Sequence, residues 1–159
     1  MKVAQMDYPI TVRSAHQSDY ERWLALWNDY NAFYGRTGAT ALNSGITATT
    51  WSRFFDPYEP MQALVAERGP QLVGLVHFLL HRSTTSIEPS IYLQDLFASE
   101  CARGCGVGRS LILAVYDYAN ARKISRVYWQ THESNIVAMK LYDKVAEKSG
   151  FVVYRNILS

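Results

Sequence analysis

The sequence predicts a mixed α/β domain, in which helices cover both faces of a mixed β-sheet. Apolar runs typical of strands alternate with segments whose apolar residues recur at helical spacing. Two of the strands, 61–67 and 71–81, flank a tight turn at 68–70, which predicts an antiparallel hairpin. The later strands are separated by helices and therefore need crossover connections, so parallel and antiparallel pairs are expected together.

The first part of the chain is expected to hold one strand and two helices. Residues 10–15 form the strand, and Ser18 with Glu21 form a capping box for the first helix. Residues 35–45 read as a loop and 49–56 as a short helix. The first helix has an aromatic face, because rings recur at spacings of four, three and four: Trp23, Trp27, Tyr30 and Tyr34.

The second part of the chain alternates strands with helices. In chain order a strand, a helix, a strand, a helix and a strand are expected at 91–98, 107–122, 126–131, 135–149 and 151–158. Gly150 ends the last helix. The order β-α-α-β-β-β-α-β-α-β predicts a single domain over 1–159, with its core at about 10–158.

Composition excludes several classes of protein. A net charge of +2 gives no electrostatic case for binding nucleic acid. No apolar run is long enough for a membrane span or a signal peptide, so no membrane partner is expected. Cys101 and Cys105 have no second pair to complete a zinc site, so we expect no metal and a reducing, cytoplasmic location.

The segment ARGCGVGRSL at 102–111 places three glycines in five positions between a strand and a helix. Helix N-termini leave N–H groups unpaired and favour anions, and glycine allows a phosphate to reach the backbone. A Walker A loop is excluded because Arg103 stands at its first glycine and Arg109 at its lysine. A Rossmann loop is excluded because its third glycine would also fall at Arg109.

The motif R-G-x-G-x-G at 103–108, after YLQDLFA, resembles the acetyl-CoA loop of the GNAT superfamily of N-acetyltransferases. Asn135 and Tyr142 match the asparagine and tyrosine of that family's fourth helix. The resemblance extends over the element order of almost the whole chain. It is closest to the branch holding diamine, histone and D-amino-acid acetyltransferases, and it implies a partly splayed sheet with acetyl-CoA as co-substrate.

The resemblance also implies which residues bind the cofactor. The main chain from Arg103 to Arg109 would meet the pyrophosphate, the strand backbone would bind the pantetheine arm and carbonyl, and Asn135 would hold an amide of the cofactor. The expected cofactor-binding residues are Leu96, Phe97, Ala98, Arg103, Gly104, Cys105, Gly106, Val107, Gly108, Arg109 and Asn135.

Tyr142 is the candidate acid for the departing thiolate. It follows Asn135 by seven residues, two helical turns, so both side chains lie on one side of the helix. The other interpretation is a core tyrosine, because Ala138, Leu141 and Val145 complete an apolar face with it.

The acceptor side departs from the family pattern. Diamine acetyltransferases have a glutamate where this chain has Gln94, and an amide cannot accept a proton. Asp95 can serve as the catalytic base only if a bulge re-aims it, since neighbouring strand residues face opposite sides. A structural role for Asp95, a water chain, or a base at Glu88 or His132 are the alternatives.

Gln94, Trp27 and Tyr30 are expected to contact the acceptor, although most of the aromatic rings have a simpler role in the core. His77 and His81 alternate with apolar residues on a strand and are expected to be structural.

The sequence therefore predicts an acetyl-CoA-dependent N-acetyltransferase that acts by direct attack in a ternary complex. The acceptor is a primary amine: a small molecule, an amino acid or a protein lysine. A non-catalytic acyl-CoA-binding sensor is the alternative, favoured by the missing glutamate. Members of the resembled branch commonly pair through their C-terminal regions, which suggests a homodimer.

Overall fold

The computed structural model of the chain describes residues 8–158. The chain forms two compact units, Met1–Trp129 and Gln130–Ser159. The strands of the first unit are β1 (Ile10–Ser14), β2 (Met61–Arg68), β3 (Gln71–His81), β4 (Ser90–Ala98) and β5 (Val127–Tyr128). Its helices are α1 (Tyr20–Phe33), α2 (Ser44–Arg53) and α3 (Val107–Ala121), while the second unit holds α4 (Ile136–Val145). The single domain over 1–159 stays a prediction.

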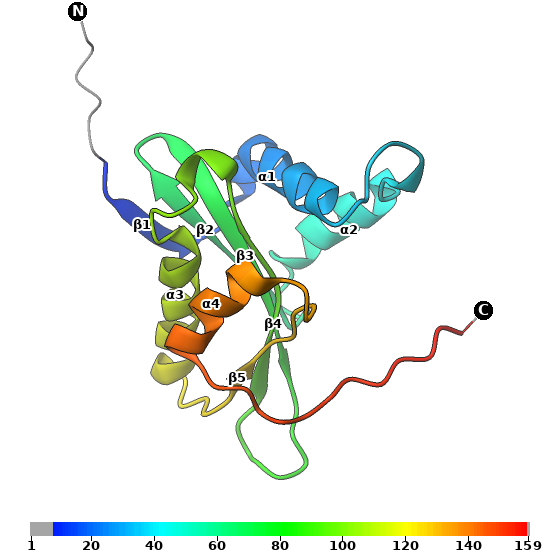
Figure 1. Cartoon of the computed structure of the whole chain (residues 1–159), viewed down its shortest axis with the longest axis vertical. Coiled ribbons are helices and arrows are strands. Elements are labelled where there is room, and N and C mark those ends of the chain that lie inside the picture. The colour runs from blue at the N-terminus through cyan, green and yellow to red at the C-terminus, as the bar shows by residue number, and fades with distance from the viewer. Residues whose placement is uncertain (1–7, 159) are drawn as a thin grey trace, which may run out of the picture. The chain divides into compact units, whose positions relative to one another are not determined.

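The strands form one mixed sheet in the order β1-β2-β3-β4-β5 (Figure 1). Each pair from β1 to β4 is antiparallel, and the last pair, β4 with β5, is parallel. The predicted hairpin is present as β2 and β3. The parallel pair follows from the crossover through α3, because a helix between two strands brings them back in the same direction.

Helices cover both faces of this sheet, as predicted, and the alternation along β3 shows how (Figure 1). Phe78 faces α3, where its ring lies 4.9 Å from that of Tyr118. His77, the preceding residue, faces α1 instead. Gly74 lies under α3, and a Cβ there would lie 2.5 Å from Val107. This glycine therefore lets the start of α3 pack directly on the sheet.

The aromatic face of α1 is the core of its side of the sheet. Its side chains pack against apolar residues of three strands, with α2 closing the cluster. The buried members are Trp23, Leu26, Trp27, Tyr30, Val65, Leu72, Leu75 and Phe97, and α2 with its C-cap adds Trp51 and Phe54. Most of the rings predicted to surround the acceptor are thus core residues, and truncating such a ring costs ~3–5 kcal/mol.

Two helix starts differ from the prediction. The capping box is not formed by Ser18 and Glu21. The backbone N–H of His16 donates to Asp19 Oδ2 at 2.8 Å, because a 3₁₀ turn at Gln17–Asp19 precedes α1. Helix α2 begins at Ser44 rather than at 49, because the Asn43 side chain accepts the Gly45 N–H at 2.8 Å and caps it there.

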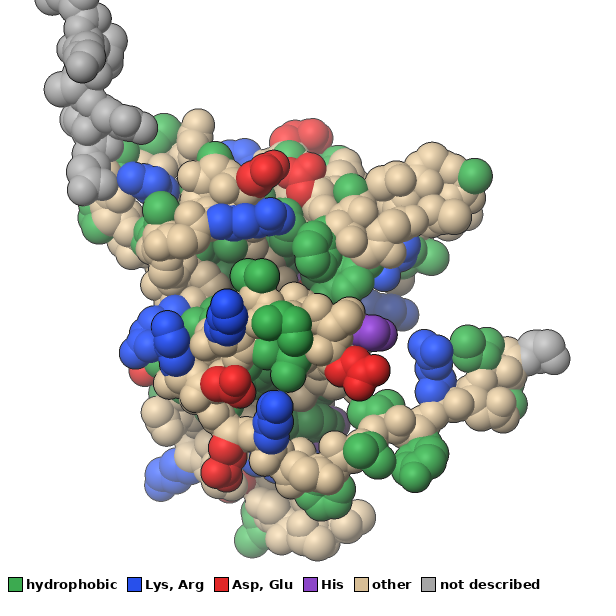
Figure 2. Space-filling view, in the orientation of Figure 1, with side chains coloured by type: hydrophobic (Ala, Val, Ile, Leu, Met, Phe, Trp, Pro, Cys, Tyr) green, Lys and Arg blue, Asp and Glu red, His purple; other side chains and the backbone are tan. Residues whose placement is uncertain are grey.

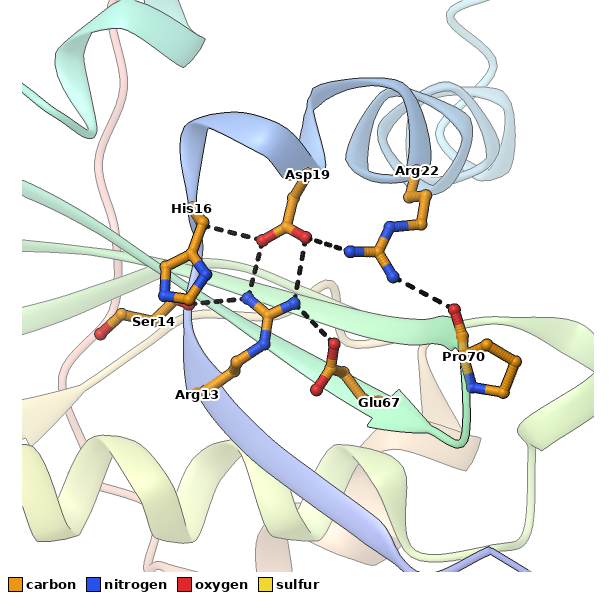
Figure 3. A network of polar contacts seen from close by, with 7 residues as sticks. All are labelled: Arg13, Ser14, His16, Asp19, Arg22, Glu67 and Pro70. Carbon is orange, nitrogen blue, oxygen red and sulfur yellow. Dashed lines mark hydrogen bonds and ion pairs between the residues drawn. The ribbon is translucent and has the colours of Figure 1, made fainter.

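A network around Asp19 ties α1 to the sheet (Figure 3). Arg13 of β1 donates to both Asp19 oxygens, at 2.7 and 3.0 Å, and to Glu67 of β2 at 2.6 Å. Arg22 donates to Asp19 and to the carbonyl oxygen of Pro70 at 3.1 Å. The hydrogen bonds from Arg13 are the main cause that lowers the pKa of Asp19 well below its usual range.

The end of the chain differs most from the prediction. The strand predicted at 126–131 is limited to Val127–Tyr128. Helix α4 ends at Val145 rather than at 149, because the backbone becomes extended at Ala146. The strand predicted at 151–158 is not formed. The described residues of this segment have no strand structure, and its apolar side chains are exposed (Figure 2).

None of the helices within residues 8–158 is both long enough and apolar enough to cross a membrane.

Candidate active site

The glycine turn leads into the N-terminus of α3 and leaves its backbone open. Gly104 and Gly106 have φ of +77° and +82°, and no atom lies within 4 Å of where a Cβ would sit on either. The first helical hydrogen bond runs from the Ser110 N–H to the Gly106 carbonyl at 2.9 Å. The N–H groups of the helix before Ser110 therefore have no acceptor within the helix. Bare glycines, free space and a helix N-terminus together fit an anionic phosphate group.

The side chains beside this turn carry positive charge, which suits an anionic phosphate group. Arg103 and Arg109 are exposed, and neither forms an ion pair with any carboxylate of the described chain. Cys101 and Cys105 are exposed free thiols. Cys105 Sγ accepts a long hydrogen bond from Arg68 at 3.9 Å. Two cations with no acidic partner border the open backbone.

Strands β4 and β5 separate soon after they meet. Their ladder consists of Ile91 with Val127 and Tyr92 with Tyr128, after which β5 ends. The remainder of β4, including 96–98, pairs only with β3 among the residues that the structure describes. The partly splayed sheet is thereby confirmed, and the backbone of 96–98 is left without a strand on that side.

A bulge in β4 re-aims Asp95. His77 pairs with Asp95 and Phe78 with Leu93, so Gln94 is the extra residue. In a regular strand, Leu93 and Asp95 would share one face. The bulge puts Leu93 on the α3 side with Phe78, and Asp95 on the α1 side with His77. The condition that the sequence sets for a catalytic Asp95 is therefore met, and Gln94 is left exposed.

Two side chains hold the Asp95 carboxylate. The Tyr30 hydroxyl of α1 donates to Oδ1 at 2.6 Å, and His77 Nδ1 lies 2.9 Å from Oδ2. Burial, followed by Asp95 itself, raises the pKa of Tyr30, so the phenol keeps its proton and remains a donor. Among residues 8–158 no lysine or arginine pairs with Asp95, and 12% of its side chain is exposed. Asp95 is thus hydrogen-bonded but has no lysine or arginine counter-ion within the described part of the chain.

Trp27 and Tyr30 were both predicted to contact the acceptor, and both are buried. The Trp27 indole donates to Thr47 Oγ1 at 3.2 Å, whereas Tyr30 reaches Asp95. A residue that the sequence analysis did not single out also lies here. The Arg36 guanidinium carbon is 5.7 Å from the Tyr30 ring centroid, and its Nε donates to Asn31 at 2.6 Å. Nothing but its place after an aromatic helix could have indicated it.

Asn135 and Tyr142 belong to the second unit. Both are half-buried; Asn135 is the N-cap of α4 and Tyr142 lies within the helix. Asn135 Nδ2 donates to Thr131 Oγ1 at 3.2 Å. His132, an alternative base, is exposed and hydrogen-bonds Ser134 within a local turn, at 2.6 Å. Glu88, the other alternative, is exposed in the loop between β3 and β4.

The fold, the splayed strands and the glycine turn define an acetyltransferase. A family model described as Acetyltransferase (GNAT) family matches residues 13–146, so the chain belongs to this family.

Among its relatives is the D-amino-acid N-acetyltransferase HPA3 of Saccharomyces cerevisiae (strain ATCC 204508 / S288c), 36% identical over 92% of this chain and 90% of the relative. The ribosomal-protein-alanine N-acetyltransferase of Brucella melitensis biovar Abortus 2308 has the same fold, with a TM-score of 0.76, 20% identity and coverage of 95% and 100%. AAC(6')-Iy, solved with the bisubstrate analogue CoA-S-monomethyl-acetylneamine, matches with a TM-score of 0.76, 14% identity and coverage of 95% and 99%.

Proposed function

We propose that this protein transfers an acetyl group from acetyl-CoA to a primary amine, by direct attack within a ternary complex. The observation that carries the proposal is Asp95, a carboxylate without a resident cation, at a bulge in the strand that leads to the open glycine turn. A carboxylate in this state suits a visiting ammonium group. The membership of the GNAT family and the names of its relatives support the same reaction.

The chain's own groups would hold acetyl-CoA along β4 and the turn. The N–H groups at the start of α3, with Arg103 and Arg109, bind the pyrophosphate. The free backbone edge of 96–98 bonds the pantetheine arm, and Asn135 holds an amide. Acetyl-CoA, when bound, supplies an acetyl group activated as a thioester.

Two side chains would move the protons. Asp95 holds the acceptor's ammonium group and takes one of its protons, which later passes to solvent, and the neutral amine then attacks the acetyl carbon. As the carbon–sulfur bond breaks, Tyr142 gives its hydroxyl proton to the sulfur, and its phenolate is restored by the second proton that the nitrogen loses in becoming an amide. The products are the N-acetylated amine and free CoA. Gln94, exposed beside Asp95, orients the acceptor by a neutral hydrogen bond.

An amino acid is the acceptor class favoured within the primary amines. Its ammonium group would meet Asp95, and Arg36, which stacks beside Tyr30, supplies a cation for its carboxylate. The D-amino-acid acetyltransferase relative supports this class. In a panel of D- and L-amino acids, polyamines and aminoglycosides, we expect amino acids to give the fastest CoA release. Arg36→Ala should then raise KM for amino acids but not for polyamines.

The experiment that tests the function measures acetyl-CoA binding by calorimetry and CoA release with the amine panel. Gly104→Ala should weaken acetyl-CoA binding at least ~10-fold, since a methyl group enters the phosphate path. Gly38→Ala is the matched control, because Gly38 also has a positive φ and open space around it. Equal affinities of these two variants would contradict the assignment of the turn. Binding without CoA release for any amine would favour the sensor.

Tyr142→Phe tests the proposed acid separately. The ring stays, so folding and acetyl-CoA affinity should change little, while kcat should fall ~10²-fold if the hydroxyl protonates the sulfur. Wild-type kcat, measured where chemistry limits the rate, would return Tyr142 to a packing role.

The assembly and the compartment are part of the proposal. The exposed apolar segment 151–158 would be covered by a second copy in a homodimer, and two exposed free thiols suit a reducing, cytoplasmic compartment. Light scattering of the full chain and of a chain shortened before Phe151 should give a dimer and a monomer respectively.

A further inference from the structure

His77 is a buried titratable side chain that the proposed chemistry does not use. It lies on β3 with 1% of its surface exposed, on the same face of the sheet as Asp95. Both of its ring nitrogens have partners. Nε2 lies 3.0 Å from the indole nitrogen of Trp23, and Nδ1 lies 2.9 Å from Asp95 Oδ2.

These partners decide where the imidazole carries its proton. An indole N–H can only donate, so His77 Nε2 must present a lone pair to Trp23. A neutral ring has one N–H, which is therefore on Nδ1 and points at Asp95. A second proton on Nε2 would meet the indole N–H and break that hydrogen bond. Trp23 therefore fixes the tautomer of His77, and in this tautomer the Nδ1–H group donates to the Asp95 carboxylate.

We propose that His77 is a positioning residue for acetyl transfer. Trp23, His77 and Asp95 form a relay of hydrogen bonds that holds the Asp95 carboxylate in one orientation. Each carboxylate oxygen then accepts one hydrogen bond from the protein, and its remaining lone pairs face the acceptor's ammonium group. His77 neither gains nor loses a proton during turnover. The proposal rests on the proposed function, because it assigns a role at the same site.

The relay works together with the remaining groups around Asp95. Tyr30 of α1 bonds the other carboxylate oxygen. Tyr92 of β4 is close enough that Asp95, after burial and Tyr128, contributes to raising its pKa. The Arg36 guanidinium carbon lies over the Tyr30 ring, 5.7 Å from its centroid. These groups are common to all variants below, so a difference between His77 variants reports on His77 alone.

The first test needs no substitution and no turnover. In ¹⁵N-detected NMR of the full chain labelled at histidine, His77 should give the signature of the neutral Nδ1–H tautomer and keep it while solvent-exposed histidines titrate. An Nε2–H tautomer, or an imidazolium at neutral pH, would overturn the proposal.

The second test uses two amide replacements that each keep one half of the relay. His77→Asn places an N–H donor near the former Nδ1 and preserves the bond to Asp95. His77→Gln places a carbonyl near the former Nε2 and preserves the bond from Trp23. We expect kcat/KM to fall ~10-fold or more in His77→Gln, the usual size for a lost hydrogen bond to a charged group, and less in His77→Asn. The acidic limb of the pH–rate profile should move to higher pH only in His77→Gln.

His81→Gln is the matched control, since His81 is on the same strand but exposed, and should keep wild-type kinetics. A merely structural His77 would lower the two variants' kcat/KM in step with their thermal stability and leave the pH profile unmoved. That result would overturn the positioning role. Absence of turnover in the wild-type protein with every amine would instead contradict the proposed function, while the NMR result would still decide the tautomer.

Discussion

Asp19, just before α1, and Asp95, on β4, are two shielded carboxylates at the contact between α1 and the sheet, and they are held in opposite ways. Asp19 is 1% exposed and bonded by two guanidinium groups, those of Arg13 and Arg22, and by a backbone N–H. Asp95 is bonded by an imidazole N–H and a phenol, and keeps 12% of its side chain exposed. One charge is neutralised within the protein, whereas the other is oriented but has no cation beside it.

The residues that bond each carboxylate indicate whether it contributes to stability or is available for chemistry. Removing one member of a buried ion pair leaves its partner uncompensated, which is costly to the fold. Neutral donors orient a carboxylate without cancelling its charge, so that charge can still act on a bound cation. Burial alone therefore does not indicate which carboxylate is functional.

The largest effect is expected from Asp95→Asn. The amide keeps the shape of the side chain but can neither take a proton nor hold an ammonium group by charge. We expect kcat/KM to fall ~10²-fold or more, with loss of the acidic limb of the pH–rate profile. Steady-state CoA release measures both. An unchanged limb would assign the base to water, Glu88 or His132.

Asp19→Asn should give the converse result. The change leaves two arginines facing a neutral amide, and we expect the free energy of unfolding to fall by about 3 kcal/mol. The kcat/KM of the folded protein, measured well below its melting temperature, should stay within ~2-fold of wild type, because Asp19 bonds Arg13, His16 and Arg22 and none of the proposed catalytic groups. Urea unfolding together with kinetics checks both, and a catalytic loss equal to that of Asp95→Asn would break the comparison.

Acid should distinguish wild type from Asp19→Asn as well. Because the pKa of Asp19 is lowered on folding from its ordinary 3.8, its stabilising contribution is complete above about pH 5 and is lost as the pH falls below 4. Glu67, whose pKa Arg13 also lowers, acts in the same direction. The difference in unfolding free energy between the two proteins should therefore be constant from pH 7 to 5 and shrink toward pH 3, as followed by urea titrations.

The smallest effect is expected at the neighbour of Asp95. Gln94→Ala removes one neutral, exposed hydrogen-bonding group, worth about 1 kcal/mol, so kcat/KM should change by less than ~10-fold. The shape of the pH–rate profile should be retained, because no titrating group is lost. Abolished turnover in a folded variant that still binds acetyl-CoA would mean that residue 94 positions the acceptor far more strongly than one hydrogen bond can.

Most of the sheet and the glycine turn could be predicted from the sequence, because each depends on local pattern. The hairpin at 68–70 and the strand-turn-helix around Gly106 are specified by residues close together in the chain. The face of the sheet on which Asp95 lies could not be predicted, because periodicity gives the face of a regular strand and a bulge shifts that face by one residue. His77 was expected to be structural, and its contact with Asp95 could not be foreseen because it depends on the β3–β4 register.

The end of the chain shows the other limit. The segment FVVYRNIL at 151–158 is rich in residues with high strand propensity, yet a strand requires a partner edge as well as propensity. A capping signal failed for a related reason. Ser18 and Glu21 have the right spacing, but the long-range bonds of Asp19 to Arg13 fix the turn there.

The bulge at Gln94 has a consequence for substitutions. Every regular residue of a strand is constrained by the neighbour opposite it, so a substitution there disturbs two strands at once. Gln94, the bulged residue, has no paired residue on β3 and is exposed next to Asp95, the only carboxylate of β4. A substitution at this position therefore need not disturb the pairing of β3 with β4, and under the proposed function it would alter the contact with the acceptor amine while Asp95 stays in place.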